Sequence, residues 1–247
     1  MKVKKRSIWT STMLFLLFLL EFSSSAFAVE YQNGIITNEE LIWRCHTCDD
    51  TKMDILFGEH WNEAGIFENL STNKKMKWRA IMVEENSTTL SSLFSIWIWK
   101  DEDSWGTQDN TSRLSYLKNP NLYPHGFNFT VAFPYVPFWL PSPVGEYLGA
   151  LQLSDMYDVD NRVLPTLNVQ IIQGSTFSDE PTETVYIIAV YNGNGIMSSF
   201  KLYTSGNVVV IDISLEDLPI LAIASTIGLL LTFFCSIVLY IKKKRIN

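Results

Sequence analysis

Cys45 and Cys48, separated by two residues, form the pattern with the most obvious chemistry in this sequence. One thiolate of such a pair can attack a substrate disulfide, and thiolates with added histidines can bind zinc. Redox pairs of this spacing follow a buried strand and open a helix in a βαβ unit, but no such alternation surrounds this pair. Asp49 and Asp50 would also raise a thiol pKa. We therefore predict a structural disulfide or an inert pair, with redox and metal roles as alternatives.

An acidic cluster contains Asp155, Asp158 and Asp160. Carboxylate oxygens are the ligands that calcium prefers, so this cluster is a candidate metal site. The alternative is a solvated acidic loop over residues 155–161. Calcium is the only cofactor that we consider, since the sequence contains no zinc-protease, phosphate-loop or nucleophile-elbow motif. We expect a protein that is not an enzyme.

Aromatic side chains are the best candidates for contact with a ligand. Residues 133–141 combine aromatic residues with three prolines, a composition that excludes a helix. Such a rigid apolar stretch either plugs a core or faces a ligand. A further pair of tryptophans lies in an apolar run at residues 93–100. The ligand-binding candidates are Trp97, Trp99, Phe133, Tyr135, Phe138 and Trp139.

Four Asn-x-Ser/Thr triplets are possible sites of glycosylation. The modification requires a secreted chain and an accessible asparagine, so these triplets also predict surface turns. The asparagines are Asn69, Asn86, Asn110 and Asn128.

Both ends of the chain carry segments typical of membrane targeting. Residues 1–28 combine a basic start, a short apolar run and a small-x-small end, a pattern typical of a cleaved export signal. Residues 218–241 contain no charged residue, and a helix of this length crosses a hydrocarbon core of about 30 Å. Because positive residues stay on the cytoplasmic side, the basic tail 242–247 predicts a cytoplasmic C-terminus. Residues 29–217 would then form the extracellular domain at the cell membrane.

The charge of this extracellular domain is strongly negative. Residues 29–217 contain 11 of the 19 Lys+Arg and 25 of the 26 Asp+Glu, for a net charge near −14. This balance disfavours nucleic acids and anionic membrane surfaces as partners. Seven of the eight tryptophans fall in the same region, which indicates a packed core and excludes a disordered stalk.

The pattern of apolar residues predicts a mainly β fold. Strands are expected at residues 41–45, 77–83, 93–100, 167–171, 184–191, 196–204 and 207–213. Asn192 to Gly195 favours a tight hairpin, because asparagine and glycine accept positive φ. Short helices are expected at residues 52–57, ended by Gly58, and at 144–153. The prediction is a curved antiparallel sheet or sandwich with one or two short helices, plus one C-terminal membrane helix. Simple alternation places Trp97 and Trp99 on one face of their strand.

This overall plan resembles uncharacterised archaeal single-pass surface proteins that have an aromatic-rich β ectodomain. The residues that carry the resemblance are Trp43 to Cys48, Lys77-Trp78, Ser95 to Trp99 and Asn192 to Val210. The resemblance implies organisation and no known activity. The region 185–213 is also similar in style to the curved sheets of lipid-carrier lipoproteins, although the export signal is not followed by their lipid-bearing cysteine.

We therefore expect a type I membrane protein with a non-enzymatic binding module at the cell surface. Its partner would be another surface protein or a glycan. One alternative is a tethered binder of a lipid or other apolar ligand. A second is a surface thiol oxidoreductase that uses Cys45 and Cys48.

Overall fold

The computed structural model describes residues 29–101, 105–123, 136–173 and 181–216. The chain divides into a unit of residues 1–30 and a unit of residues 31–247, and every element named below lies in the second. The predicted export signal, the apolar segment 218–241 and the basic tail lie outside the described residues and stay predictions. Within the described part, no helix has the length and apolar character that a bilayer crossing requires.

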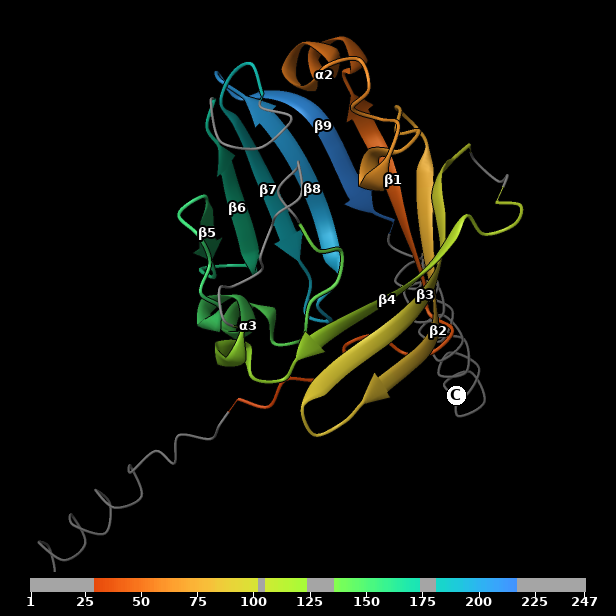
Figure 1. Ribbon diagram of the computed structural model, residues 1–247, viewed down its shortest axis with the longest axis vertical. Helices are drawn as coiled ribbons and strands as arrows, with labels where there is room; N and C mark the ends of the chain where they lie inside the picture. The colour runs from red at the N-terminus through yellow and green to blue at the C-terminus, as the bar shows by residue number, and fades with distance from the viewer. Residues whose placement is uncertain (1–28, 102–104, 124–135, 174–180, 217–247) are drawn as a thin grey trace, which may run out of the picture. The chain divides into compact units, whose positions relative to one another are not determined.

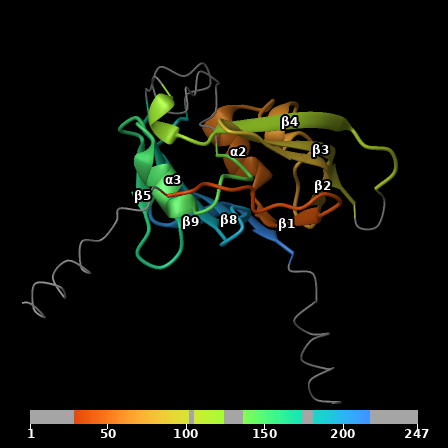
Figure 2. The same ribbon diagram turned by 90° about the horizontal axis from the view of Figure 1, so that it is seen from below.

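Nine antiparallel strands form a single sheet, which confirms the prediction of a mainly β fold with short helices. The order across the sheet is β4-β3-β2-β1-β9-β8-β7-β6-β5. All the described strands belong to this one sheet, and it curves across its width (Figures 1 and 2). The elements are β1 (Glu40–Cys48), α2 (Asp50–Phe57), β2 (Lys75–Glu85), β3 (Thr89–Lys100), β4 (Asn110–Leu117), α3 (Val144–Ala150), β5 (Tyr157–Asp160), β6 (Thr166–Ile171), β7 (Val185–Tyr191), β8 (Met197–Thr204) and β9 (Val208–Leu215).

Two meanders meet at the centre of this sheet. Strands β1 to β4 form the first and β5 to β9 the second, and β1 pairs with β9 between them. Antiparallel neighbours need only short turns, which is why the predicted hairpin at Asn192 to Gly195 joins β7 to β8. Because β4 and β5 are the two edges, the connecting residues 118–156 have to pass from one edge of the sheet to the other.

Local capping explains helix α2. The Asp49 side chain accepts a hydrogen bond from the Lys52 backbone N–H, and Gly58 ends the helix at a φ of 89°. The end of the helix at Gly58 was expected from the sequence. The prediction of an acidic loop at residues 155–161 is wrong, because residues Tyr157–Asp160 form strand β5 and pair with β6. Strand β4 had no prediction, since its polar sequence carries little apolar alternation.

A bulge in β3 overturns the expected arrangement of its two tryptophans. Lys75 pairs with Lys100 and Lys77 pairs with Trp97, so β3 contains one residue more than β2 in this interval. Trp99 adopts a φ of 31° at this point and is 1% exposed, whereas Trp97 is only half-buried on the opposite face. The prediction that both side chains share one face is therefore wrong.

The two faces of the sheet differ sharply in what covers them. One face, here called the inner face, carries the buried side chains, such as Leu41, Trp43 and Cys45 of β1. Residues 136–140 cross this inner face and are all buried, and we call them the plug segment. The Leu140 N–H donates to the Gly195 carbonyl at 2.8 Å, which satisfies an extended backbone that would otherwise lose its partners on burial.

Aromatic packing holds the plug segment in place. The Phe138 ring stacks on Trp78 and meets Trp43 edge-on, with centroids 5.4 and 4.9 Å away. The Tyr116 hydroxyl donates to the Trp139 carbonyl at 2.8 Å from strand β4. Burial of one such ring contributes roughly 1.5–3 kcal/mol, and aromatic contacts of this geometry add to it. The plug is therefore part of the core.

Replacing Gly195 by alanine should loosen the plug. Gly195 has a φ of 81°, and an added Cβ would lie 1.9 Å from the Leu140 carbonyl oxygen. We expect Gly195→Ala to lower the free energy of unfolding by about 2–4 kcal/mol in urea denaturation of residues 29–217. Gly193→Ala is the control, because a Cβ there meets nothing within 4 Å. Equal unfolding midpoints for the two variants would contradict this account of the plug.

Candidate functional site

The turn between β5 and β6 borders an open hollow of about 410 Å³. Its lining is mixed: two carboxylates, an amide, a guanidinium and one apolar side chain converge on it. Because β5 is an edge strand, this hollow lies at a border of the sheet and not beneath it. The lining residues are Asp158, Val159, Asp160, Asn161 and Arg162.

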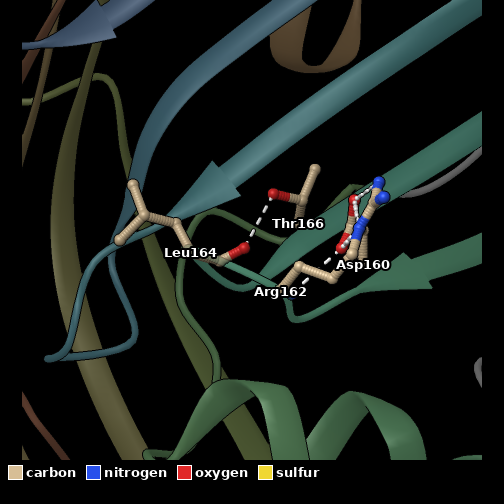
Figure 3. Close-up of polar contacts among 4 residues, drawn as sticks. All are labelled: Asp160, Arg162, Leu164 and Thr166. Carbon is tan, nitrogen blue, oxygen red and sulfur yellow. Dashed lines mark hydrogen bonds and ion pairs between the residues drawn. The ribbon is translucent and has the colours of Figure 1, made fainter.

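Short polar contacts hold the turn in one shape. The Arg162 guanidinium donates hydrogen bonds to both carboxylate oxygens of Asp160 (Figure 3). Its Nε lies 3.0 Å from Oδ1, and its Nη2 lies 2.6 Å from Oδ2. The Thr166 hydroxyl donates to the Leu164 carbonyl at 2.9 Å, and Asn161 Nδ2 donates to a carbonyl of α3 at 3.0 Å. The hydrogen bonds from Arg162 lower the pKa of Asp160 to about 2. The turn is thus ordered before any partner arrives.

Two apolar side chains project from this ordered turn. Val163 is 90% exposed and Leu164 is 52% exposed, directly after Arg162. We call these two residues the apolar tip. Sequence reasoning missed the tip, because it treated residues 155–161 as the end of an acidic loop and assigned nothing to the apolar pair that follows.

The calcium prediction for Asp155, Asp158 and Asp160 is not supported by a cluster of ligands. Within the described ranges, no group of three or more His, Cys, Asp or Glu side chains is placed to hold a metal ion. Asp158 and Asp160 do point to the same face of β5, but Arg162 already neutralises Asp160. Calcium binding stays a prediction.

A bulge in β1 brings Cys45 and Cys48 to one face. Residues three apart in a regular strand point to opposite faces, but the register shifts by one residue between Cys45 and Thr47. The extra residue turns Cys48 to the face of Cys45, whereas His46 lies on the other side, where its Nε2 is 2.7 Å from the Ser214 hydroxyl. The two thiols share a hydrogen bond, while His46 points away from them.

The surroundings of these thiols suppress their reactivity. Both cysteines are free thiols in this structure, with Cys45 buried and Cys48 half-buried. The hydrogen bond to Cys45 raises the pKa of Cys48 most, followed by burial and by the nearby Asp50 carboxylate. A thiol with a raised pKa is a poor nucleophile at neutral pH. The bulge would also suit a disulfide, which stays a prediction.

Trp97 belongs to a second cluster, on the face of the sheet opposite the plug, here called the outer face. The Lys77 ammonium lies 4.1 Å from the centroid of the Trp97 ring and 4.6 Å from that of Trp105. Trp97 Nε1 donates to the Gly106 carbonyl at 3.2 Å, which holds the loop over the lysine. Lys77 is only 9% exposed, so the two rings replace much of its hydration. Trp105 and Lys77 were not predicted, because only the fold brings them together.

The remaining aromatic candidates lie in the core or outside the described residues. Phe138 and Trp139 are 3% and 0% exposed, as the core-plugging alternative for their stretch describes, and Trp99 is also buried, at 1% exposed. Trp99 also donates from Nε1 to the Ile66 carbonyl at 2.6 Å. Phe133 and Tyr135 lie outside the described residues.

Three of the four predicted glycosylation sites are accessible. Asn69, Asn86 and Asn110 are exposed, and Asn128 lies outside the described residues. Asn69 lies in a loop and Asn86 in the hairpin between β2 and β3, as the surface-turn prediction requires. Asn110 instead begins strand β4. Glycosylation itself stays a prediction.

Comparisons of the chain with protein families, curated proteins and solved structures find no match.

Removing the Asp50 carboxylate should activate Cys48. Cys48 Sγ donates to Asp50 Oδ1 at 3.3 Å, so Asp50→Asn lowers the thiol pKa and increases its thiolate fraction. We expect iodoacetamide to alkylate Cys48 several-fold faster in this variant at pH 8, as measured by peptide mass spectrometry. Asp54→Asn, in the same helix, is the control. Unchanged alkylation in Asp50→Asn would show that the carboxylate does not govern the thiol.

Replacing Arg162 should return Asp160 to ordinary titration. A carboxyl with a depressed folded pKa contributes stability above its unfolded pKa, and this contribution disappears as pH falls through the folded value. For Asp160, the stabilising contribution of the ionised carboxylate therefore disappears only as the pH falls to about 2. In Arg162→Gln, we expect the pKa of Asp160 to rise toward its usual range in an NMR titration. Arg113→Gln, on β4, should leave it low, and identical titrations in both variants would refute the assignment.

Proposed function

We propose that this chain is a type I single-pass membrane protein whose acidic ectodomain is a non-enzymatic binding module at the cell surface. The observation that carries the proposal is the apolar tip, since Val163 and Leu164 are 90% and 52% exposed on a turn held by polar contacts. Two adjacent exposed aliphatic side chains form a small apolar surface, and its burial by a partner would be favourable. An ordered turn loses little further entropy on binding, which favours recognition.

The partner best matched to this turn is another surface protein. The apolar tip would enter an apolar depression, while Asp158 and Arg162 beside it would fix orientation through charged hydrogen bonds. The area offered by one turn is small, so the contact would be weak unless several copies act together. A glycan remains the other partner class, since the hollow is lined mainly by polar groups.

The two alternative functions have weaker support. A carrier of lipid or another apolar ligand needs an empty apolar space, but the inner-face side chains Leu41 and Trp43 are buried, and Phe138 of the plug segment packs against Trp43. A thiol oxidoreductase needs an accessible thiolate, but Cys45 is buried and the pKa of Cys48 is raised. Calcium at Asp155, Asp158 and Asp160 would serve as a structural addition to the binding module.

Photo-crosslinking in intact cells tests the contact. We expect a benzoylphenylalanine at position 163 of the full chain to yield a discrete protein adduct. The same probe at Val208, a valine that is 51% exposed at the start of β9, should yield none. Similar adducts at both positions, or none at either, would count against a binding role for the tip.

Carbonate washing and protease treatment of intact cells test the anchor separately. The full chain should stay in the membrane fraction at high pH, and external protease should digest residues 29–217. Release of the chain by carbonate would refute the membrane topology, whatever the crosslinks show.

A further inference from the structure

The outer face of β1 and β2 gathers cations in a domain that is acidic overall. Arg44, Lys75, Lys77 and Arg79 all lie there, with Arg44 opposite Lys75 in the strand register. These are four of the 11 Lys+Arg in residues 29–217, and we call them the basic face. Two carboxylates share this face, because Glu216 pairs with Arg44 and Lys75 and Glu40 lies opposite Arg79 in the register. The four cations outnumber these two carboxylates, so the face is more positive than the net charge of the domain suggests.

Tryptophans complete this surface. Trp97 and Trp105 flank Lys77 on the same side of the sheet, and both are half-buried. Tryptophan with lysine and arginine is the composition that proteins use at the boundary between water and lipid. The aromatic ring suits the headgroup region, and the cations attract lipid phosphates.

The chain leaves the domain beside this face. The Glu216 N–H donates to the Ile42 carbonyl at 2.7 Å, and its carboxylate pairs with Arg44 at 2.6 Å and with Lys75 at 3.2 Å. The predicted membrane segment begins at residue 218, only two residues later. Two residues reach at most about 7 Å, and the headgroup layer is about 5–8 Å thick on each side of the bilayer. Arg44 and Lys75 are thus held at the level of the headgroups.

The direction of β2 decides which surface meets the bilayer. Strand β2 runs parallel to β9, and it continues past the level of Glu216 from Lys77 to Glu85, about 26 Å at strand spacing (Figure 1). Its exposed, charged tip cannot enter hydrocarbon. The hairpin must therefore run along the membrane, with one face toward it. The inner-face side chains of β1, β2 and β3 are buried in the core, so the outer face is the one available.

We propose that the basic face, with Trp97 and Trp105, lies on the phosphate-bearing headgroups of the membrane that anchors the chain. This inference rests on the anchor in the proposed function. Docking of this face fixes the orientation of the domain, and anionic lipids strengthen it. The net negative charge of the ectodomain does not prevent this contact, because four of its 11 Lys+Arg gather on this one surface.

Lipid photo-crosslinking in nanodiscs tests the orientation. The full chain is reconstituted in nanodiscs that contain about 30% anionic lipid, so that the bilayer surface is negatively charged. Benzoylphenylalanine replaces either Ile81 or Ile55. Ile81 is 43% exposed and follows Arg79 on β2, whereas Ile55 is 56% exposed on α2. We expect lipid adducts at position 81 and few at position 55. Equal yields, or protein adducts alone at position 81, would overturn the proposal.

Charge reversal tests the role of the cations. Arg79 is exposed, so Arg79→Glu leaves the core intact. Each charge near an anionic surface is worth about a factor of five, so this variant should lower the lipid-adduct yield at position 81 by about tenfold or more. Lys52→Glu, on α2, makes the same change in net charge and should have no effect. An unchanged yield in Arg79→Glu would refute electrostatic docking.

The carbonate wash distinguishes a failure of the membrane anchor from a failure of the docking by the basic face. A chain that carbonate releases has no anchor, and the proposed function fails with the inference. A chain that stays in the membrane without adducts at position 81 keeps its anchor but has a different orientation.

Discussion

Burial of the plug segment against the inner face is the interaction on which the rest of this structure depends. A nine-stranded open sheet exposes one apolar face unless something covers it, and its edge strands β4 and β5 are joined by a connection that must cross that face. The proline-rich sequence keeps this crossing extended, so its backbone groups need partners. Gly195 and Met197 supply them, and the Trp43–Trp78–Phe138 cluster supplies the apolar contact.

Single-residue bulges then decide which chemistry the strands present. In β1, one extra residue sets Cys48 on the same face as Cys45, with His46 on the opposite face from both thiols. In β3, another sends Trp99 into the core and leaves Trp97 on the outer face. Successive side chains of a strand alternate between its two faces, so one inserted residue moves every later side chain to the other face. The thiol pair and the Lys77 sandwich are both products of such shifts.

Charge is distributed in a way that composition cannot reveal. The ectodomain is near −14 overall, which disfavours anionic surfaces, yet strand register aligns Arg44 with Lys75 and places Lys77 and Arg79 beside them. The same fold ties Glu216 to this surface, immediately before the apolar segment. Electrostatic attraction acts over about 8 Å at physiological salt, so the local arrangement of charges outweighs the net charge. An acidic domain can thereby carry a locally cationic surface.

By itself, the sequence determined what depends on nearby residues. The cap at Asp49, the stop at Gly58 and the tight turn at residues 192–195 are local preferences of the backbone, and the meander that ends the domain follows from them. Strands β4 and β5 escaped prediction because they are edge strands, whose polar residues leave little apolar alternation. The apolar tip, the Trp105–Lys77 contact and the burial of Trp139 were decided only by tertiary structure. The Trp105–Lys77 contact and the burial of Trp139 join residues that are distant in sequence, and the exposure of the apolar tip depends on what the fold packs around it. No local preference of the backbone encodes these features.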